Sequence, residues 1–411
     1  MRMTFLLMAV MVLALAAMAS QAADKTDRFV QDRFVISFWV DPPAEEITDA
    51  RYKEIADAGF TVVHGAFGPQ TEKDVEKQLA LCRKYGLLAI IKSNLSSMDN
   101  LPDGPEVLGY HLVDEPQAGS IPDIKKAVDA FRRAHPGKLV YVNLLPNYAS
   151  PAQLGAKDYD EYVGRYARET GLDVLSMDYY PMMTPTADGR EGYCNNLAAM
   201  RKYALEMGVP HWNFFNTMPF GPHYDPTEAQ LRWQVYTSLA YGSKGVLYFC
   251  YWTPGKGDAG KGEFPKGGAI ITAEGLRTRH YEQAKRINAG LKDLGPTIMK
   301  LTSTDVIRIK PDDDPQKALA GSPVKSITKG GDYLIGVFKH ADGRRAVLIN
   351  NYDCNYTSWP TVEFYAFPRN VVEVDKADGR EKPVRDDSPE MPGLQISLDA
   401  GEGRLFLLPA K

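Results

Sequence analysis

One segment carries most of the information on the fold: Gly109-Tyr110-His111-Leu112-Val113-Asp114-Glu115-Pro116. Its apolar and aromatic residues are typical of a buried strand, and the proline after the two acids ends that strand. Two adjacent carboxylates at such a point either cap the next helix or belong to a site. The next helix is predicted to begin near Ser120 or Pro122, with Ser120 as the better cap, so the acids lie upstream of the cap position. We therefore interpret Glu115 as a functional residue.

Asp114 is harder to place than its neighbour. Successive side chains of a regular strand point to opposite faces, so Asp114 and Glu115 would point apart. Both reach the same end of a sheet only if strand pairing stops at Val113.

Eight strand-like segments alternate with amphipathic helical stretches between residue 34 and about residue 294. This alternation is typical of parallel βα units, and eight units over about 260 residues match a (β/α)8 TIM barrel in number and length. A doubly wound open sheet is the alternative, but no glycine-rich dinucleotide-binding motif follows any strand. The third unit differs, because residues 93–106 resemble a loop. The predicted strands are 34–40, 61–67, 87–92, 107–113, 138–144, 173–179, 210–216 and 245–252.

From about residue 295 the pattern changes to short strands separated by Gly and Asp turns. These segments are 305–309, 333–339, 345–350, 370–374 and 394–398. We therefore predict three parts: a signal peptide (1–22), an α/β barrel (23–295) and a C-terminal antiparallel β-sandwich domain (296–411). The sandwich is predicted to support the barrel rather than to bind carbohydrate, because such folds carry no function by themselves.

The first residues resemble a secretory signal peptide. Arg2 provides a positive charge, an almost unbroken apolar run covers residues 5–19, and small residues stand at Ser20 and Ala22. An uncleaved anchor is the alternative. We expect a secreted or periplasmic protein with no integral membrane segment once the signal peptide is removed.

The composition argues against several classes of function. The chain has 48 Lys and Arg against 52 Asp and Glu, a formal net charge of −4, which gives no basic surface for nucleic acid. The four cysteines are far apart and include no C-x-x-C pair, so neither a disulfide scaffold nor a cysteine zinc site is expected. No third histidine stands at metal-ligand spacing with His64 and His111, and hydrogen bonding is favoured for both. We predict no metal and no cofactor.

In barrel enzymes the chemistry takes place at the C-terminal ends of the strands, and strand alternation selects one face. Ionisable or amide side chains recur at these ends, together with Ser37 and Ser176: Asp41, His64, Lys92, His111, Glu115, Asn143, Asp178 and Asn216. A structural aspartate paired with Lys92 is the alternative interpretation of Asp178. Tyr180, Tyr251 and Trp252 provide flat rings that match the C–H faces of sugars, although core packing explains them equally well.

These motifs resemble the (β/α)8 glycoside hydrolases. The run 111–116 is similar to the acid-bearing motif on their fourth strand, and residues 240–252 are similar to the eighth-strand region of β-galactosidase-like members. Residues 398–406 resemble the last strands of the sandwich domain that such enzymes often carry. The resemblance implies a TIM barrel, glycosidase activity and a carbohydrate substrate.

One position departs from that resemblance. In the large retaining clan, the resemblance implies a nucleophilic glutamate at the end of strand seven. Here that strand reads Val209-Pro210-His211-Trp212-Asn213-Phe214-Phe215-Asn216-Thr217, without a carboxylate. The adjacent Asp114 and Glu115 instead resemble the substrate-assisted hexosaminidases, in which the glutamate is the acid and the aspartate holds the sugar's acetamido group as the internal nucleophile.

Cleavage of a glycosidic bond requires a proton for the leaving oxygen and a nucleophile or negative charge at the anomeric carbon. Glu115 is predicted to be the general acid/base, with its pKa raised by burial and by Asp114 or Asp178. The second role falls to Asp178 as nucleophile or base, or to Asp114 acting through a substrate acetamido group. A carboxyl separation of about 5 Å would indicate direct attack, and one of about 6.5–9.5 Å would indicate inversion.

Two other hypotheses remain. The first is a carbohydrate-binding barrel that does not catalyse hydrolysis. The second is a different hydrolase or lyase that uses His64, His111 or Lys92 as a base. No G-x-S-x-G or H-E-x-x-H motif is present, so serine esterase and zincin mechanisms have no support.

Overall fold

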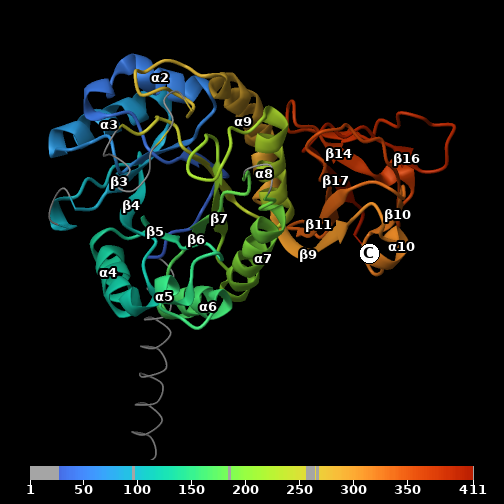
Figure 1. Cartoon of the computed structure of the whole chain (residues 1–411), viewed down its shortest axis with the longest axis horizontal. Helices are drawn as coiled ribbons and strands as arrows, with labels where there is room; N and C mark the ends of the chain where they lie inside the picture. Colours follow the sequence, from blue (N-terminus) through green and yellow to red (C-terminus); the bar gives the residue numbers. More distant parts are fainter. Residues whose placement is uncertain (1–26, 95–97, 184–186, 256–263, 265–267, 411) are drawn as a thin grey trace, which may run out of the picture.

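The computed structural model describes residues 27–94, 98–183, 187–255, 264 and 268–410. The expected signal peptide, residues 1–22, lies outside this described part. Within the described part, none of the helices combines the length and the apolar character that crossing a bilayer requires. A barrel of strands and helices contacts a smaller, mainly β region along one side (Figure 1).

Eight parallel strands form the barrel: β1 (Val35–Phe38), β2 (Val62–Gly65), β3 (Leu88–Lys92), β4 (Val107–Asp114), β5 (Leu139–Leu144), β6 (Leu175–Asp178), β7 (His211–Asn216) and β8 (Gly245–Phe249). Their order in the sheet is β1-β8-β7-β6-β5-β4-β3-β2. The sheet closes where the Thr61 N–H, next to β2, donates to the Ile36 carbonyl in β1 at 2.9 Å. Each strand lies within a predicted segment or extends one residue beyond it. The (β/α)8 prediction is therefore confirmed.

Helices surround the strands: α2 (Asp49–Asp57), α3 (Glu72–Tyr85), α4 (Ile121–Ala134), α5 (Pro151–Leu154), α6 (Tyr159–Glu169), α7 (Arg190–Met207), α8 (Glu228–Ala240) and α9 (Arg279–Ile298). Between β3 and β4 the described residues contain only the short 3-10 helix η2 (Met98–Asn100), in agreement with the predicted loop. Ser120 occupies the N-cap position of α4, but its side chain makes no capping hydrogen bond, so that part of the prediction is wrong. The reason is that the 3-10 helix η3 (Ala118–Ser120) runs directly into α4 and leaves Ser120 in a helical rather than an extended conformation.

One face of the strands fills the barrel interior with large apolar side chains, among them Tyr141, Trp212 and Phe214. The other face packs against the helices, where Tyr110 and Tyr248 are fully buried. Because the interior is closed below by these rings, polar groups on the inner face can reach solvent only near the C-terminal ends of the strands.

The C-terminal region contains nine strands: β9 (Leu301–Ile309), β10 (Val324–Ile327), β11 (Tyr333–His340), β12 (Arg345–Asn351), β13 (Thr361–Phe364), β14 (Val372–Val374), β15 (Glu381–Pro383), β16 (Leu394–Gln395) and β17 (Gly403–Leu408). They form a six-stranded sheet, β15-β14-β17-β12-β11-β9, and a three-stranded sheet, β10-β13-β16, and all pairings in both are antiparallel. Apolar side chains of both sheets, such as Ile335, Val362 and Phe406, form one core. This confirms the predicted β-sandwich.

The outer face of the six-stranded sheet packs against α8 of the barrel, and the three-stranded sheet lies on the far side (Figure 1). Asn350 Nδ2 donates to the Tyr236 carbonyl at 2.7 Å. The rings of Trp233 and Tyr352 meet edge to face with their centroids 5.0 Å apart. These buried contacts fix the sandwich to the helical side of the barrel, away from the ends of β3 and β4.

Candidate active site

A cavity of about 900 Å³ opens at the C-terminal end of the barrel. The loops after β1, β2, β3 and β8 line it together with the end of β4. Trp39, Lys92, His111, Asp114 and Trp252 all face this cavity. Four of these five were predicted to lie at the mouth of the barrel.

A local irregularity in β4 brings its two acids to this mouth. Pairing with β5 shifts by one residue between His111 and Val113, which places Asp114 opposite Asn143. Glu115 follows with φ +47°, a backbone conformation that side chains other than glycine rarely adopt. Strand pairing therefore continues through Asp114, although the sequence analysis required it to stop at Val113 for both acids to reach the mouth. A β-bulge and one left-handed residue turn both acids to the same end of the sheet.

Asn143 holds two of the acids together. Its Nδ2 donates to Asp178 Oδ1 at 2.9 Å and to Asp114 Oδ1 at 3.2 Å. Ser176 Oγ donates to Asn143 Oδ1 at 3.3 Å, which fixes the orientation of the amide. Three consecutive strands, β4, β5 and β6, thus contribute to one hydrogen-bonded cluster.

The third acid, Glu115, hydrogen-bonds with Asp178. Asp178 is buried, and burial together with the neighbouring Glu115 and Asp114 raises its pKa. Burial also raises the pKa of Glu115, although its side chain stays exposed to solvent at the mouth. Burial and the Glu115 carboxyl raise the pKa of Asp114 to about 7. Two carboxyls this close resist double ionisation, which contributes to the raised pKa of Asp178.

Two histidines lie on the other side of the mouth. His64 Nε2 and His111 Nδ1 are 2.9 Å apart, so one donates to the other. Burial and the Lys92 charge lower the pKa of His111 to about 4, while burial and His111 lower that of His64. Both rings are therefore neutral at physiological pH. Trp39 packs edge-on against both, with centroid distances of 4.7 and 5.5 Å.

Four of the predicted site residues have other surroundings. Asp41 lines the cavity, but its carboxyl group is buried and accepts hydrogen bonds from the loop after β2. Asn216 is buried and accepts from the Met182 N–H at 3.3 Å. Tyr251 is also buried and stacks on Phe38, outside the barrel interior.

The fourth, Tyr180, hydrogen-bonds with Asp178 from within the barrel. Asp178 has Asn143, Glu115 and Tyr180 as polar neighbours. Among the described residues it forms no ion pair with Lys92, the alternative that the sequence left open.

Sequence reasoning missed two residues at the mouth. Trp39 has the same strand phase as Ser37, so period-2 alternation continued past the end of β1 could have identified it. Tyr148 is about half-exposed in the loop after β5, and its partial burial together with the charges of Asp178 and Glu115 raises its pKa. It stands four residues beyond the strand, where no periodic signal applies.

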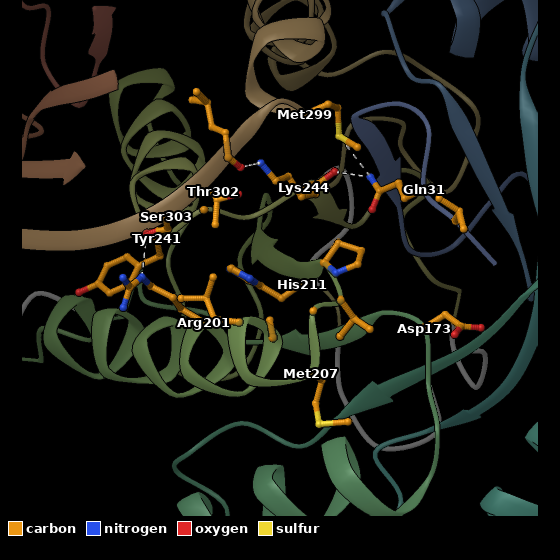
Figure 2. Close-up of a pocket in the computed structure, with 18 of the residues that line it drawn as sticks. Gln31, Asp173, Arg201, Met207, His211, Tyr241, Lys244, Met299, Thr302 and Ser303 are labelled. Atoms are coloured by element: carbon orange, nitrogen blue, oxygen red, sulfur yellow. Dashed lines mark hydrogen bonds between the residues drawn. The ribbon is translucent and has the colours of Figure 1, made fainter. Parts of the chain in front are cut away.

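A second cavity, of about 660 Å³, lies at the opposite end of the barrel, where β7 and β8 begin (Figure 2). Arg201, His211 and Lys244 lie around it. Arg201 Nε donates to Ser303 Oγ at 2.7 Å, and Lys244 Nζ donates to the carbonyls of Ile298 and Leu301. These cationic groups thus anchor the first residues of the C-terminal domain. In a TIM barrel this end serves stability rather than catalysis.

The described residues contain no group of three or more His, Cys, Asp or Glu side chains arranged to hold a metal ion. No protein-family model and no curated protein matches the chain. Solved structures do match it. A β-galactosidase from Bacillus circulans sp. alkalophilus gives a TM-score of 0.58 at 11% identity, over 92% of this chain and 99% of that one.

Two further structures are similar. A catalytic mutant of a family 42 β-galactosidase from G. stearothermophilus gives a TM-score of 0.56 at 10% identity, over 92% of this chain and 98% of that one. A family 39 glycoside hydrolase from Bacteroides cellulosilyticus WH2 gives 0.50 at 13% identity, over 91% and 80%. At these identities the similarity establishes the fold. The chain shares a (β/α)8 barrel fold with these three solved structures.

Proposed function

We propose that this protein is a glycoside hydrolase that cleaves an O-glycosidic bond in an oligo- or polysaccharide, with Glu115 as general acid/base. The observation that carries the proposal is the cluster of Asp114, Glu115 and Asp178 beside a cavity of about 900 Å³. A cavity of that size accommodates a sugar, and a pair of carboxyls with raised pKa values is what protonation of a glycosidic oxygen requires.

In this mechanism, Glu115 donates its proton to the glycosidic oxygen as the C–O bond breaks. It then takes a proton from the water that completes the reaction. Its exposure at the mouth gives it access to substrate. Asp178, buried behind it, hydrogen-bonds with Glu115 and holds the carboxyl in place.

The second role in catalysis is best assigned to Asp114. Direct attack by a carboxylate usually requires a separation of about 5 Å from the acid, whereas Asp178 is in hydrogen-bond contact with Glu115. Asp114 faces the cavity and is held by Asn143. It can stabilise positive charge at the anomeric carbon, or orient an acetamido group on the substrate.

The test is the Glu115→Gln variant, assayed on a panel of natural oligosaccharides and of aryl glycosides with a good leaving group. Loss of a general acid is expected to lower the turnover of natural substrates by about 10²–10⁴-fold. Aryl glycosides should lose less, since their leaving group needs little protonation. Glu45→Gln is the matched control, because Glu45 is exposed on the rim of the same cavity. Wild-type turnover by Glu115→Gln would overturn the assignment.

One observation favours a second candidate, a carbohydrate-binding barrel without hydrolytic activity. The segment from β7 into the next loop, Asn216-Thr217-Met218, has no carboxylate. This candidate predicts that the wild type binds glycans but releases no reducing ends from any member of the panel. The same panel therefore separates the two.

We also propose that the protein acts outside the cytoplasm, in the periplasm or secreted, on the basis of residues 1–22. Mass spectrometry of the N-terminus of the exported protein tests this. A mature chain that begins near Ala23 is expected, and an intact leader would contradict the proposal.

A further inference from the structure

Exposed aromatic rings gather in one short segment of the C-terminal domain. Five Trp, Tyr and Phe side chains are exposed in the part of the chain that the structure describes, and four of them lie within residues 356–367. This segment contains β13, the central strand of the three-stranded sheet. That sheet lies on the side of the domain away from the barrel (Figure 1).

Strand alternation explains which rings face solvent. Val362 and Phe364 of β13 are buried in the sandwich core. Trp359 and Tyr365 have the opposite phase and are 60% and 61% exposed. The segment is already extended before β13 begins, because Ser358 and Leu398 pair as an antiparallel bridge. The outer face of the sheet thus carries a ring at each end of one strand.

Polar side chains lie between the two rings. Thr361 and Glu363 have the same outward phase, and Thr361 pairs with Gln395 of β16. Glu363 forms an ion pair with Lys325 of β10 at 2.6 Å. Gly393 keeps this surface open, since a Cβ there would come within 2.7 Å of the Thr361 methyl group. The floor between the rings can therefore exchange hydrogen bonds with a ligand.

The spacing suits an extended ligand. Trp359 and Tyr365 are six residues apart, which corresponds to about 20 Å along a strand at roughly 3.4 Å per residue. Beyond Tyr365, the 69% exposed ring of Phe367 borders a further cavity of about 890 Å³, to which Arg345 and Asn370 contribute polar groups. The aromatic line thus continues past the end of β13.

We propose that this outer face of the β10-β13-β16 sheet is a glycan-binding surface, distinct from the barrel mouth, that holds an extended saccharide chain across Trp359 and Tyr365. Flat rings stack on the C–H faces of sugars, and the floor between them bonds to hydroxyl groups. The core of a protein–protein interface is apolar and depleted in charge, whereas the centre of this face carries the Lys325–Glu363 pair. The choice of a glycan rests on the proposed function.

The experiment measures retention of the full-length protein on amorphous cellulose, insoluble chitin and insoluble xylan. The Glu115→Gln background is used, so that no substrate is consumed. Retention on at least one of these polysaccharides is expected. Replacing both rings, Trp359→Ala with Tyr365→Ala, should weaken the retention at least tenfold. Trp359→Tyr, which keeps a flat ring, should preserve most of it.

Leu276→Ala is the matched control, because Leu276 is 66% exposed outside this face. Retention on none of the three polysaccharides, or equal retention by the double-ring variant, would overturn the proposal. So would a change of oligomeric state on ring removal without any glycan retention, since the face would then bind a second copy of the chain.

A separate assay keeps this proposal distinct from the proposed function. With Glu115 intact, the double-ring variant should hydrolyse short soluble oligosaccharides at the wild-type kcat/KM. Failure of the wild type to hydrolyse any glycan would refute the function, and retention of the inactive variant would still test the surface.

Discussion

Replacing Asp41 by asparagine separates a structural role for this acid from a role in substrate binding. Asp41 is 1% exposed. Its Oδ1 accepts from the N–H groups of Phe67 and Gly68, at 3.1 and 2.8 Å, and its Oδ2 accepts from Gln78 Nε2 at 2.9 Å. These bonds fix the loop after β2. Burial nevertheless outweighs them and raises the pKa of Asp41 to about 6.

Asparagine fits this position with little rearrangement. Its carbonyl oxygen keeps both backbone hydrogen bonds. Gln78 Oε1 has no partner in the native structure and can rotate to accept the new amide N–H. In the native structure, Gln78 Nε2 donates to the Tyr52 hydroxyl at 2.8 Å. After the rotation, Gln78 Oε1 can instead accept from this hydroxyl. The substitution thus removes a buried charge, and the Gln78 amide N–H that the rotation leaves unpaired adds a cost that does not depend on pH.

The expected gain in stability depends on pH. A folded-state pKa of about 6 against 3.8 in the unfolded chain means that the folded protein binds this proton more tightly. In the wild type, the stability that protonated Asp41 contributes is therefore complete below pH 3.8 and is lost as the pH rises through 6. The full difference corresponds to about 3 kcal/mol, of which about 1.4 kcal/mol falls between about pH 5 and 8.

Urea denaturation of the wild type and Asp41→Asn at pH 5 and at pH 8 measures this effect. The free energy of unfolding of the variant, relative to the wild type, should rise by about 1.4 kcal/mol between the two pH values. Catalytic efficiency should change little, because Asp41 is occupied by the loop. A difference that stays constant with pH would refute the reasoning on burial, and a large rise in KM would return Asp41 to the substrate site.

Three other substitutions test the site and the domain contact. Asp178→Asn should move the alkaline limb of the kcat/KM profile to lower pH by about one unit. In the variant, loss of the proton from Glu115 no longer leaves two touching carboxylates. The repulsion between two such charges at 4 Å is about 1 kcal/mol in water and more at a partly buried pair. Gly109→Ala should abolish activity, since its Cβ would lie 2.1 Å from the Leu139 carbonyl oxygen and force β4 away from β5; turnover and melting temperature measure this. Asn350→Ala should lower the free energy of unfolding by about 1 kcal/mol in urea denaturation, because it removes a buried hydrogen bond between the C-terminal domain and α8.

Matched controls accompany these variants. Gly119→Ala adds a methyl group where nothing lies within 4 Å, so it should retain activity. Asn355→Ala changes an exposed asparagine of the same domain and should leave stability within about 0.5 kcal/mol of the wild type. An unmoved alkaline limb in Asp178→Asn would mean that the two carboxyls do not repel each other. An active Gly109→Ala enzyme would mean that the pairing of β4 with β5 does not position the acids.

The fold followed from the sequence because its signals are local. Buried strands such as β4 and β5 appear as apolar and β-branched runs, and the intervening helices repeat their apolar residues with helical spacing. The loss of long helices after residue 298 marked the sandwich, where only the short helices α10 (Pro315–Ala318) and η4 (Pro368–Asn370) accompany the strands. Period-2 alternation also identified most of the polar side chains at the mouth, including His64, His111 and Asn143.

The arrangement of the acids depended on tertiary structure. Alternation alone points Asp114 and Glu115 apart, and only the register shift against β5 brings them to one end of the sheet. Whether Asp178 pairs with Lys92 or with Glu115 depends on the side chains of neighbouring strands. The raised pKa of Asp178 likewise requires burial and nearby carboxyls, which no single segment encodes.

The sequence by itself therefore determined which residues form strands and which of their ends carry acids, since these properties repeat within a few residues along the chain. Only the tertiary structure decided which of these polar groups are held by neighbouring residues, as Asp41 and Tyr251 are. The physical reason is that a side chain's partners come from strands and loops distant in sequence, and their register is set by packing across the closed sheet.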